Sequence, residues 1–137
     1  MSRGIGAHAN KVFEDNETII YEYGGYNLND KKFRNENHIY DGSILIPRSC
    51  FVEPEIHKKM KKMPNGKRKL ITKRIPILVE YEKMIEEGIV VIKNCSHCWY
   101  TTNDARHIDM MALRILSHVF QQYQVEGEIP EYISYNV

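Results

Sequence analysis

The sharpest chemical motif in the sequence is one pair of cysteines three residues apart, Cys95-Ser96-His97-Cys98. Two thiolates at this spacing can bind zinc, but a structural zinc site takes four ligands. Cys50 and either His97 or His107 would have to complete it. Because a single C-x-x-C pair is weak evidence, we predict no metal and keep the pair only as a weak zinc candidate. The odd number of cysteines, three, also argues against a disulfide framework.

The residues offer no catalytic constellation. Six histidines are present, and His97 or His107 could serve a cysteine as a general base. However, the sequence contains no nucleophile elbow, no Walker phosphate loop and no metal-binding histidine spacing. We therefore predict a protein that is not an enzyme and that uses no cofactor.

Positive charge is concentrated in one segment. Between His57 and Arg74 the chain carries nine of its nineteen basic residues and no acidic residue. Pro64-Asn65-Gly66 is a strong turn signal, so we predict a basic arm or hairpin over about residues 57–75. Such an arm suits nucleic-acid phosphates or one wall of a phosphate pocket, and it equally suits a solvated loop. The residues of the nucleic-acid alternative are Lys58, Lys59, Lys61, Lys62, Lys67, Arg68 and Lys69.

Apolar residues at helical spacing predict one long helix over Asn103–Gln124. Thr102 or Asn103 would cap its first turn, with Asp104 at the positive end of the helix dipole, and Gly127 would end it. The apolar face contains Ile108, Met111, Ala112, Ile115, Leu116, Val119, Phe120 and Tyr123.

Two further sides of this helix carry functional expectations. Met110 and Leu113 extend the apolar surface to a second side, which either another element of the chain or a second copy of the protein would cover. We predict a homo-oligomer that forms through this helix. His107, Arg114 and His118 form a cationic stripe along one edge. This stripe can line a pocket or stand in water.

The rest of the chain predicts a small α+β fold. Extended runs at 7–13, 18–23 and 43–46, the first two joined by a tight turn at Asp15-Asn16, predict an N-terminal antiparallel meander. A shorter helix is expected over Ile77–Glu87, closed by Gly88, and a buried strand over Ile89–Ile92. The meander would pack against the long helix in a single domain, residues 1–137. The Gly24-Gly25 pair predicts a bulge or a close backbone approach.

The composition is that of an ordinary globular protein. Of the 137 residues, 42% are hydrophobic and 27% are charged, and the net charge of +1 gives no global reason to expect nucleic-acid or membrane binding. The longest aliphatic run, Ile89 to Ile92, is far too short to span a membrane, and the N-terminus has no apolar signal core. We expect a cytoplasmic protein that has no membrane partner.

Three segments support a resemblance to a known family. Ser2-Arg3-Gly4-Ile5-Gly6-Ala7-His8, Tyr21-Glu22-Tyr23-Gly24-Gly25-Tyr26 and Asn94-Cys95-Ser96-His97-Cys98-Trp99, together with the order of elements, resemble the phage anti-Thoeris proteins of the first type. These small proteins sequester the cyclic ADP-ribose signal of a bacterial immune system. The resemblance implies a homo-oligomeric nucleotide sponge, acting in the host cytoplasm against antiviral defence. It assigns no binding residue.

The sequence thus predicts a non-enzymatic protein that binds a phosphorylated nucleotide signal. Its pocket is expected where the sheet meets the start of the long helix. Arg114 and His107, with His118 on the same stripe, would contact phosphate or ribose, and Trp99 would stack on the base. Arg48 or Lys73 would complete the charge balance. The alternative is a nucleic-acid-binding or nucleoprotein-inhibiting protein that acts through Lys58–Arg74.

Overall fold

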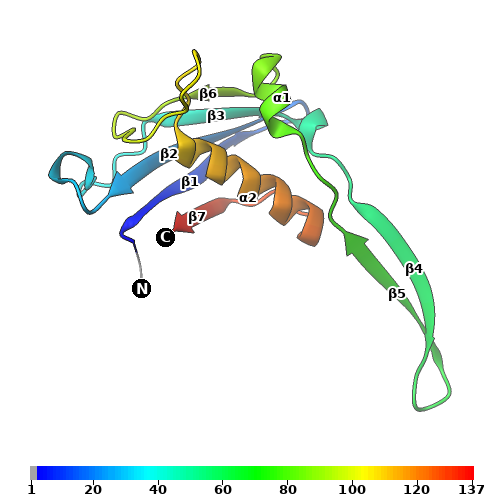
Figure 1. Cartoon of the computed structure of the whole chain (residues 1–137). Coiled ribbons are helices and arrows are strands. Elements are labelled where there is room, and N and C mark those ends of the chain that lie inside the picture. The colour runs from blue at the N-terminus through cyan, green and yellow to red at the C-terminus, as the bar shows by residue number, and fades with distance from the viewer. Residues whose placement is uncertain (1–2) are drawn as a thin grey trace.

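A five-stranded antiparallel sheet and one long helix form the body of the protein, and a two-stranded hairpin projects from it (Figure 1). The structure is a computed structural model that describes residues 3–137; Ser2, part of the segment that carries the resemblance, lies outside the described residues. The strand order in the main sheet is β6-β3-β2-β1-β7. The elements are β1 (Ile5–Glu14), β2 (Thr18–Asn27), β3 (Gly42–Pro47), β4 (Glu55–Lys62), β5 (Arg68–Ile75), α1 (Tyr81–Glu86), β6 (Val91–Lys93), α2 (Met110–Glu126) and β7 (Tyr132–Asn136).

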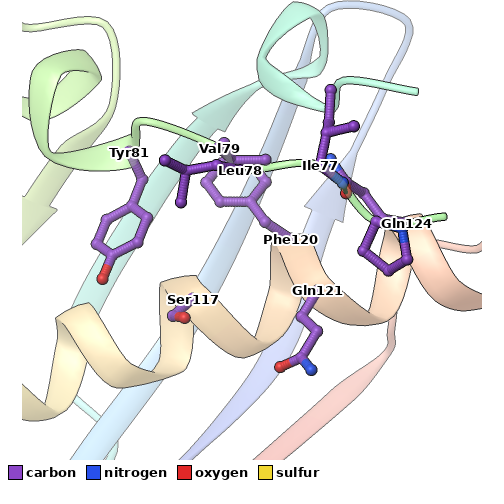
Figure 2. A pocket seen from close by; sticks show the side chains of 9 residues that line it. Ile77, Leu78, Val79, Tyr81, Ser117, Phe120, Gln121 and Gln124 are labelled. Carbon is purple, nitrogen blue, oxygen red and sulfur yellow. Dashed lines mark hydrogen bonds between the residues drawn. The ribbon is translucent and has the colours of Figure 1, made fainter. Parts of the chain in front are cut away.

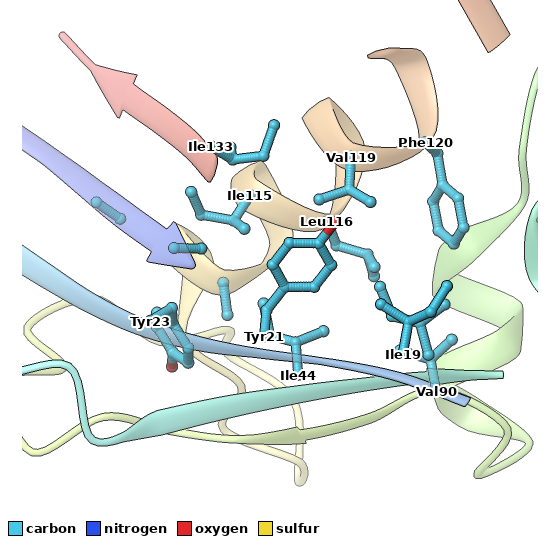
Figure 3. Packing of buried hydrophobic residues seen from close by; sticks show 14 of the residues in the cluster. Ile19, Tyr21, Tyr23, Ile44, Val90, Ile115, Leu116, Val119, Phe120 and Ile133 are labelled. Carbon is cyan, nitrogen blue, oxygen red and sulfur yellow. The ribbon is translucent and has the colours of Figure 1, made fainter. Parts of the chain in front are cut away.

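The core lies between α2 and one face of the sheet (Figure 3). Alternate residues of β1, β2 and β3 point to this face, as the two-residue period of a strand requires. Ala7 and Ala9 of β1 are fully buried, and their small side chains leave room for the helix. The larger buried side chains from the strands and from α2 are Ile19, Tyr21, Tyr23, Ile44, Ile46, Met111, Ile115, Leu116, Val119, Phe120 and Ile133.

The predicted α+β class is confirmed, and so are the N-terminal meander and its first turn, although β2 continues through Gly24-Gly25 to Asn27. β1, β2 and β3 pair in sequence order. The Asp15 carboxylate accepts hydrogen bonds from the backbone N–H groups of Glu17 and Thr18, which closes the β1–β2 turn. Within residues 3–137 no helix is long and apolar enough to cross a membrane.

The predicted start of the long helix is wrong by seven residues. α2 begins at Met110, and its N-cap is Asp109, which accepts a hydrogen bond from the Met111 N–H, in place of Thr102 or Asn103. The preceding segment folds back on itself: Thr102 N–H donates to the Ile108 carbonyl and Met110 N–H donates to the Tyr100 carbonyl. These bonds satisfy backbone groups that a helix over 103–109 would have used.

The end of the long helix lies close to its predicted position. Gly127 has a φ of +78° and its N–H donates to the Tyr123 carbonyl, as a glycine C-cap does. The helix itself runs to Glu126, two residues past the predicted Gln124.

Three other sequence predictions need correction. The shorter helix is Tyr81–Glu86 and not Ile77–Glu87, because the Gln124 side chain binds the Ile77 N–H and holds the preceding segment extended. The buried strand expected at Ile89–Ile92 is instead the edge strand Val91–Lys93, in which no residue is buried. The sequence reading also missed β7, in which Ile133 is the only buried residue, so the strand has little apolar pattern.

The predicted basic hairpin is confirmed as β4 and β5. The Met63 N–H donates to the Lys67 carbonyl and the Gly66 N–H donates to the Met63 carbonyl, closing the turn between the strands. At the base of the hairpin, Arg74 Nε donates to the Gln124 carbonyl at 2.8 Å. The hairpin extends away from the sheet, at the far end from the loop after β2 (Figure 1).

Removing one core side chain of α2 tests this packing. Leu116 has 0% of its surface exposed, so Leu116→Ala is expected to lower the free energy of unfolding by about 2–5 kcal/mol. The matched control is Leu78→Ala, because Leu78 is 88% exposed and its truncation is expected to cost less than about 0.5 kcal/mol. Urea denaturation measures both, and equal losses would contradict the described core.

Candidate functional site

The six residues predicted to bind a ligand do not form one pocket. Arg48 lies at the β1–β2 turn, where its Nη2 donates to the Asp15 carbonyl and lies 3.5 Å from the Glu14 carboxylate. Lys73 lies on the projecting hairpin. Trp99 and His107 lie in the loop before α2, and His107 has a φ of +47° outside the helix.

The predicted cationic stripe is therefore shorter than expected. Arg114 and His118 are exposed on α2, and the His118 ring lies 5.5 Å from the ring of Tyr135. His107 is not on the helix, so it does not continue the stripe. Trp99 stacks on Tyr100 at 5.6 Å, and its indole Nε1 is a buried nitrogen that has no hydrogen-bond partner within residues 3–137.

A buried carboxyl group occupies the start of α2, where the pocket was expected. Asp109 is fully buried; one of its oxygens accepts from the Met111 N–H at 2.9 Å and the other from the Tyr23 hydroxyl at 3.0 Å. Burial raises the pKa of Asp109, because it disfavours the charged form, although these hydrogen bonds act in the opposite direction. Asp109 thus joins the first turn of α2 to the centre of β2.

The two cysteines of the C-x-x-C motif lie beside the same carboxyl group. Cys95 Sγ donates to Asp109 at 3.5 Å. Burial first, and then the neighbouring Asp109, raises the pKa of Cys95 to about 11 and that of Cys98 to about 12. These raised pKa values disfavour the thiolate form, which is the form that zinc binds. Within residues 3–137, no three side chains of His, Cys, Asp or Glu are placed to hold a metal ion.

A small apolar cavity lies between α2 and the extended segment before α1 (Figure 2). Its volume is about 180 Å³ and its walls include Ile77, Val79 and Phe120. Gln124 closes one end, since its side chain accepts from the Ile77 N–H and donates to the Val52 carbonyl. The cavity is small and has few polar groups that could bind a charged ligand.

Aromatic rings gather on the opposite face of the sheet, which α2 does not cover. The His8 ring on β1 lies between Tyr26 of β2 and Tyr132 of β7, with ring centroids 5.7 and 6.0 Å away and planes inclined by only 19° and 16°. His8 Nδ1 is hydrogen-bonded to the Tyr132 hydroxyl at 2.6 Å. His8 is thus stacked with a tyrosine on either side. These three nearly parallel rings form an aromatic floor on this face of the sheet.

Two glycines provide space for the tyrosines of this face. A Cβ atom on Gly6 would lie 2.8 Å from the Tyr26 hydroxyl oxygen, so Tyr26 packs directly over the backbone of Gly6. A Cβ atom on Gly24 would lie 2.5 Å from Cδ1 of Tyr40. The close backbone approach predicted for the Gly24-Gly25 pair is thus confirmed at Gly24, whereas the register shift lies in β1, between Lys11 and Phe13.

The loop after β2 turns this floor into a pocket. The loop is fixed by Asn35, which is buried and whose side chain hydrogen-bonds with the carbonyl of Gly25 and with both backbone groups of Ile39. Asn35 and His38 have positive φ angles of 52° and 51°, an uncommon conformation that often marks functional sites. We call the resulting cavity of about 290 Å³ the aromatic pocket; it is lined by His8, Gly24, Tyr26, Leu28, Arg34, Asn35, Glu36, His38 and Tyr40.

The polar groups of the aromatic pocket are suited to an anionic ligand. The Arg34 side chain is 43% exposed; its Nε donates to the Leu28 carbonyl at 3.3 Å, and its Nη1 lies 3.9 Å from the Glu36 carboxylate. Burial, and secondarily the nearby His38, lowers the pKa of His8, so His8 is neutral at neutral pH. The pocket therefore offers an uncharged aromatic floor with one guanidinium group, that of Arg34, and one carboxylate, that of Glu36, in its wall.

Sequence reasoning missed the aromatic pocket. Its residues come from β1, β2 and a polar loop, and only the β1–β2 register brings His8 opposite Gly24. The available signals were the tyrosines and glycines of residues 21–26, followed by the asparagine-rich loop.

Comparison with known proteins leaves function to be argued from this chain's own residues. None of the protein-family models, curated proteins or solved structures compared with the chain matches it. The resemblance to anti-Thoeris proteins remains a prediction.

The buried Asp109 gives a prediction of pH dependence. Its raised folded-state pKa means that its contribution to stability is greatest at low pH and decreases as the pH rises through that pKa. Asp109→Asn keeps an oxygen for the Met111 N–H and removes the titration. We expect the free energy of unfolding of the variant, relative to that of the wild type, to increase between about pH 4 and about pH 8. Urea denaturation across this range checks the result, and a constant difference would contradict it.

Proposed function

We propose that this protein binds a nucleotide-type small molecule, without chemically changing it, in the aromatic pocket. The observation that supports this proposal is the stacked pair of aromatic rings, Tyr26 and His8, which lines a cavity together with Arg34. A nucleobase is planar and stacks on aromatic rings, which contributes about 1–3 kcal/mol per base. A phosphate is recognised by a guanidinium group through charge-assisted hydrogen bonds.

The pocket supports a ligand of limited size. Its volume of about 290 Å³ is at the lower end of the range of about 300–1,000 Å³ typical of small-molecule sites. Tyr40 and His38 stand on the loop side of the floor, and Glu36 can accept hydrogen bonds from an amino or hydroxyl group. A pocket of this size takes about one base with its ribose and phosphate, so the rest of a larger messenger such as cyclic ADP-ribose would extend out of it.

The family resemblance extends this proposal to a biological role. It would make the protein a sponge that sequesters a messenger of the cyclic ADP-ribose type and so counters host antiviral defence. Sequestration requires tight binding and no turnover, which agrees with the expectation from the sequence of a protein that is not an enzyme. The homo-oligomer, predicted to form through the side of α2 that carries Met110 and Leu113, belongs to the same proposal.

Ligand-induced stabilisation tests the proposal directly. A nucleotide at about one hundred times its dissociation constant stabilises the folded state by about 2.7 kcal/mol, which corresponds to a rise in melting temperature of about 5–10 °C for a chain of this length. We expect such a rise with at least one member of a panel that contains adenosine monophosphate, cyclic AMP and cyclic ADP-ribose. Arg34→Gln is expected to weaken that ligand at least about tenfold, because it removes a charged hydrogen-bond donor.

The matched control is Arg114→Gln, which removes an exposed arginine from α2 outside the aromatic pocket. It is expected to leave the dissociation constant unchanged in isothermal titration calorimetry. If Arg114→Gln abolishes binding and Arg34→Gln does not, the ligand lies at the α2 edge and not in the aromatic pocket. A melting temperature that no nucleotide of the panel changes would contradict the proposed function.

A further inference from the structure

The projecting hairpin takes no part in the core, and its own stability is limited. Every residue of β4 is exposed, and in β5 only Arg74 and Ile75 are half buried. An isolated two-stranded hairpin is at best marginally stable in water. Residue pairs that weaken the hairpin further therefore need a functional explanation.

Like charges face each other across this hairpin. Lys61 is directly opposite Lys69, and Lys62 is directly opposite Arg68. Such pairs are destabilising, and the segment from His57 to Arg74 contains no acidic residue that could offset the repulsion. The apolar pair Met60–Leu70 supplies local cohesion. The remaining repulsion is relieved when a polyanion binds.

Each face of the hairpin carries four lysines or arginines, and a cavity lies on one of the two faces. Residues directly opposite each other share a face, so His57 and Lys73 lie on the same side as the Lys61–Lys69 pair. This side is concave and contains a cavity of about 690 Å³. We call it the basic groove; its residues include His57, Lys59, Lys61, Ile71, Lys73 and Ile75.

We propose that the hairpin binds double-stranded DNA, with the basic groove facing the phosphate backbone. Lysines supply sequence-independent, salt-dependent affinity for phosphates. A two-stranded ribbon fits the major groove of B-form DNA, which is about 12 Å wide, whereas the major groove of A-form RNA is too narrow. At about 3.4 Å per residue, the eight residues of β4 extend about 27 Å, enough to follow several phosphates.

This site is separate from the aromatic pocket. The hairpin leaves the body at the opposite end of the molecule from the loop after β2 that forms the pocket wall (Figure 1). DNA binding can therefore be tested independently of nucleotide binding. The near-neutral net charge of +1 also means that any affinity for DNA comes from the hairpin and not from the protein as a whole.

Fluorescence anisotropy of a labelled 20-base-pair DNA duplex, titrated with the full chain, tests the proposal. We expect binding at about 50 mM salt that weakens steeply by about 200 mM. The triple variant Lys59→Gln, Lys61→Gln, Lys69→Gln should reduce the magnitude of the slope of log K against log salt by about one per lysine removed. The variant Lys59→Arg, Lys61→Arg, Lys69→Arg keeps the charge and should bind as the wild type does.

Matched controls separate this site from general electrostatics and from misfolding. Lys31→Gln, Lys83→Gln, Lys93→Gln removes three exposed lysines outside the hairpin and should leave the salt slope nearly unchanged. Circular dichroism and the nucleotide-dependent melting temperature of the glutamine triple variant should equal those of the wild type. Absence of duplex binding at about 50 mM salt, an equal loss in the control triple, or equal affinity for duplex RNA would overturn the proposal.

Discussion

The single helix α2 packed on one face of the sheet is the constraint on which the rest of the structure depends. Fully buried alanines on β1 allow the helix to approach closely, and the side chains of Leu116 and Val119 fill the space between the layers. Asp109 fixes where the helix begins, because its two oxygens bind both the first turn and the Tyr23 hydroxyl. Burying the Asp109 carboxyl group costs desolvation free energy, and its hydrogen bonds to the helix and to β2 offset part of that cost.

Covering only one face leaves the other face of the sheet without an apolar partner. That face carries aromatic residues with polar tips, and glycines rather than larger side chains lie beneath Tyr26 and Tyr40. Hydrogen bonds between side chains, such as that of His8 with Tyr132, order the rings in the absence of a covering layer. The hairpin β4–β5 holds its cations away from the body of the protein. Repulsion between these cations therefore does not disturb the packed core.

How much the sequence could predict depends on how local each determinant is. The β1–β2 turn follows from Asp15 and the helix end follows from Gly127, because each residue acts on its own neighbours. The start of α2 could not be predicted from neighbouring residues. Asp109, and not Asn103, is the N-cap because Asp109 also accepts a hydrogen bond from Tyr23, which is far away in the sequence. β7 contributes one buried residue and is held mainly by backbone pairing with β1. The aromatic pocket could not be predicted from the sequence. Its residues are brought together by the register of β1 and β2, and no local sequence pattern specified that register.

The central claim is that the uncovered face of the sheet binds a nucleotide at His8, Tyr26 and the loop that carries Arg34. The most direct measurement is a nuclear magnetic resonance titration of the isotope-labelled protein with adenosine monophosphate or cyclic ADP-ribose. The account predicts that backbone amide shifts concentrate in residues 8, 24–26 and 34–40, and that the amides of the hairpin do not change. Shifts confined to residues 99–118, or no shifts at saturating ligand, would contradict it.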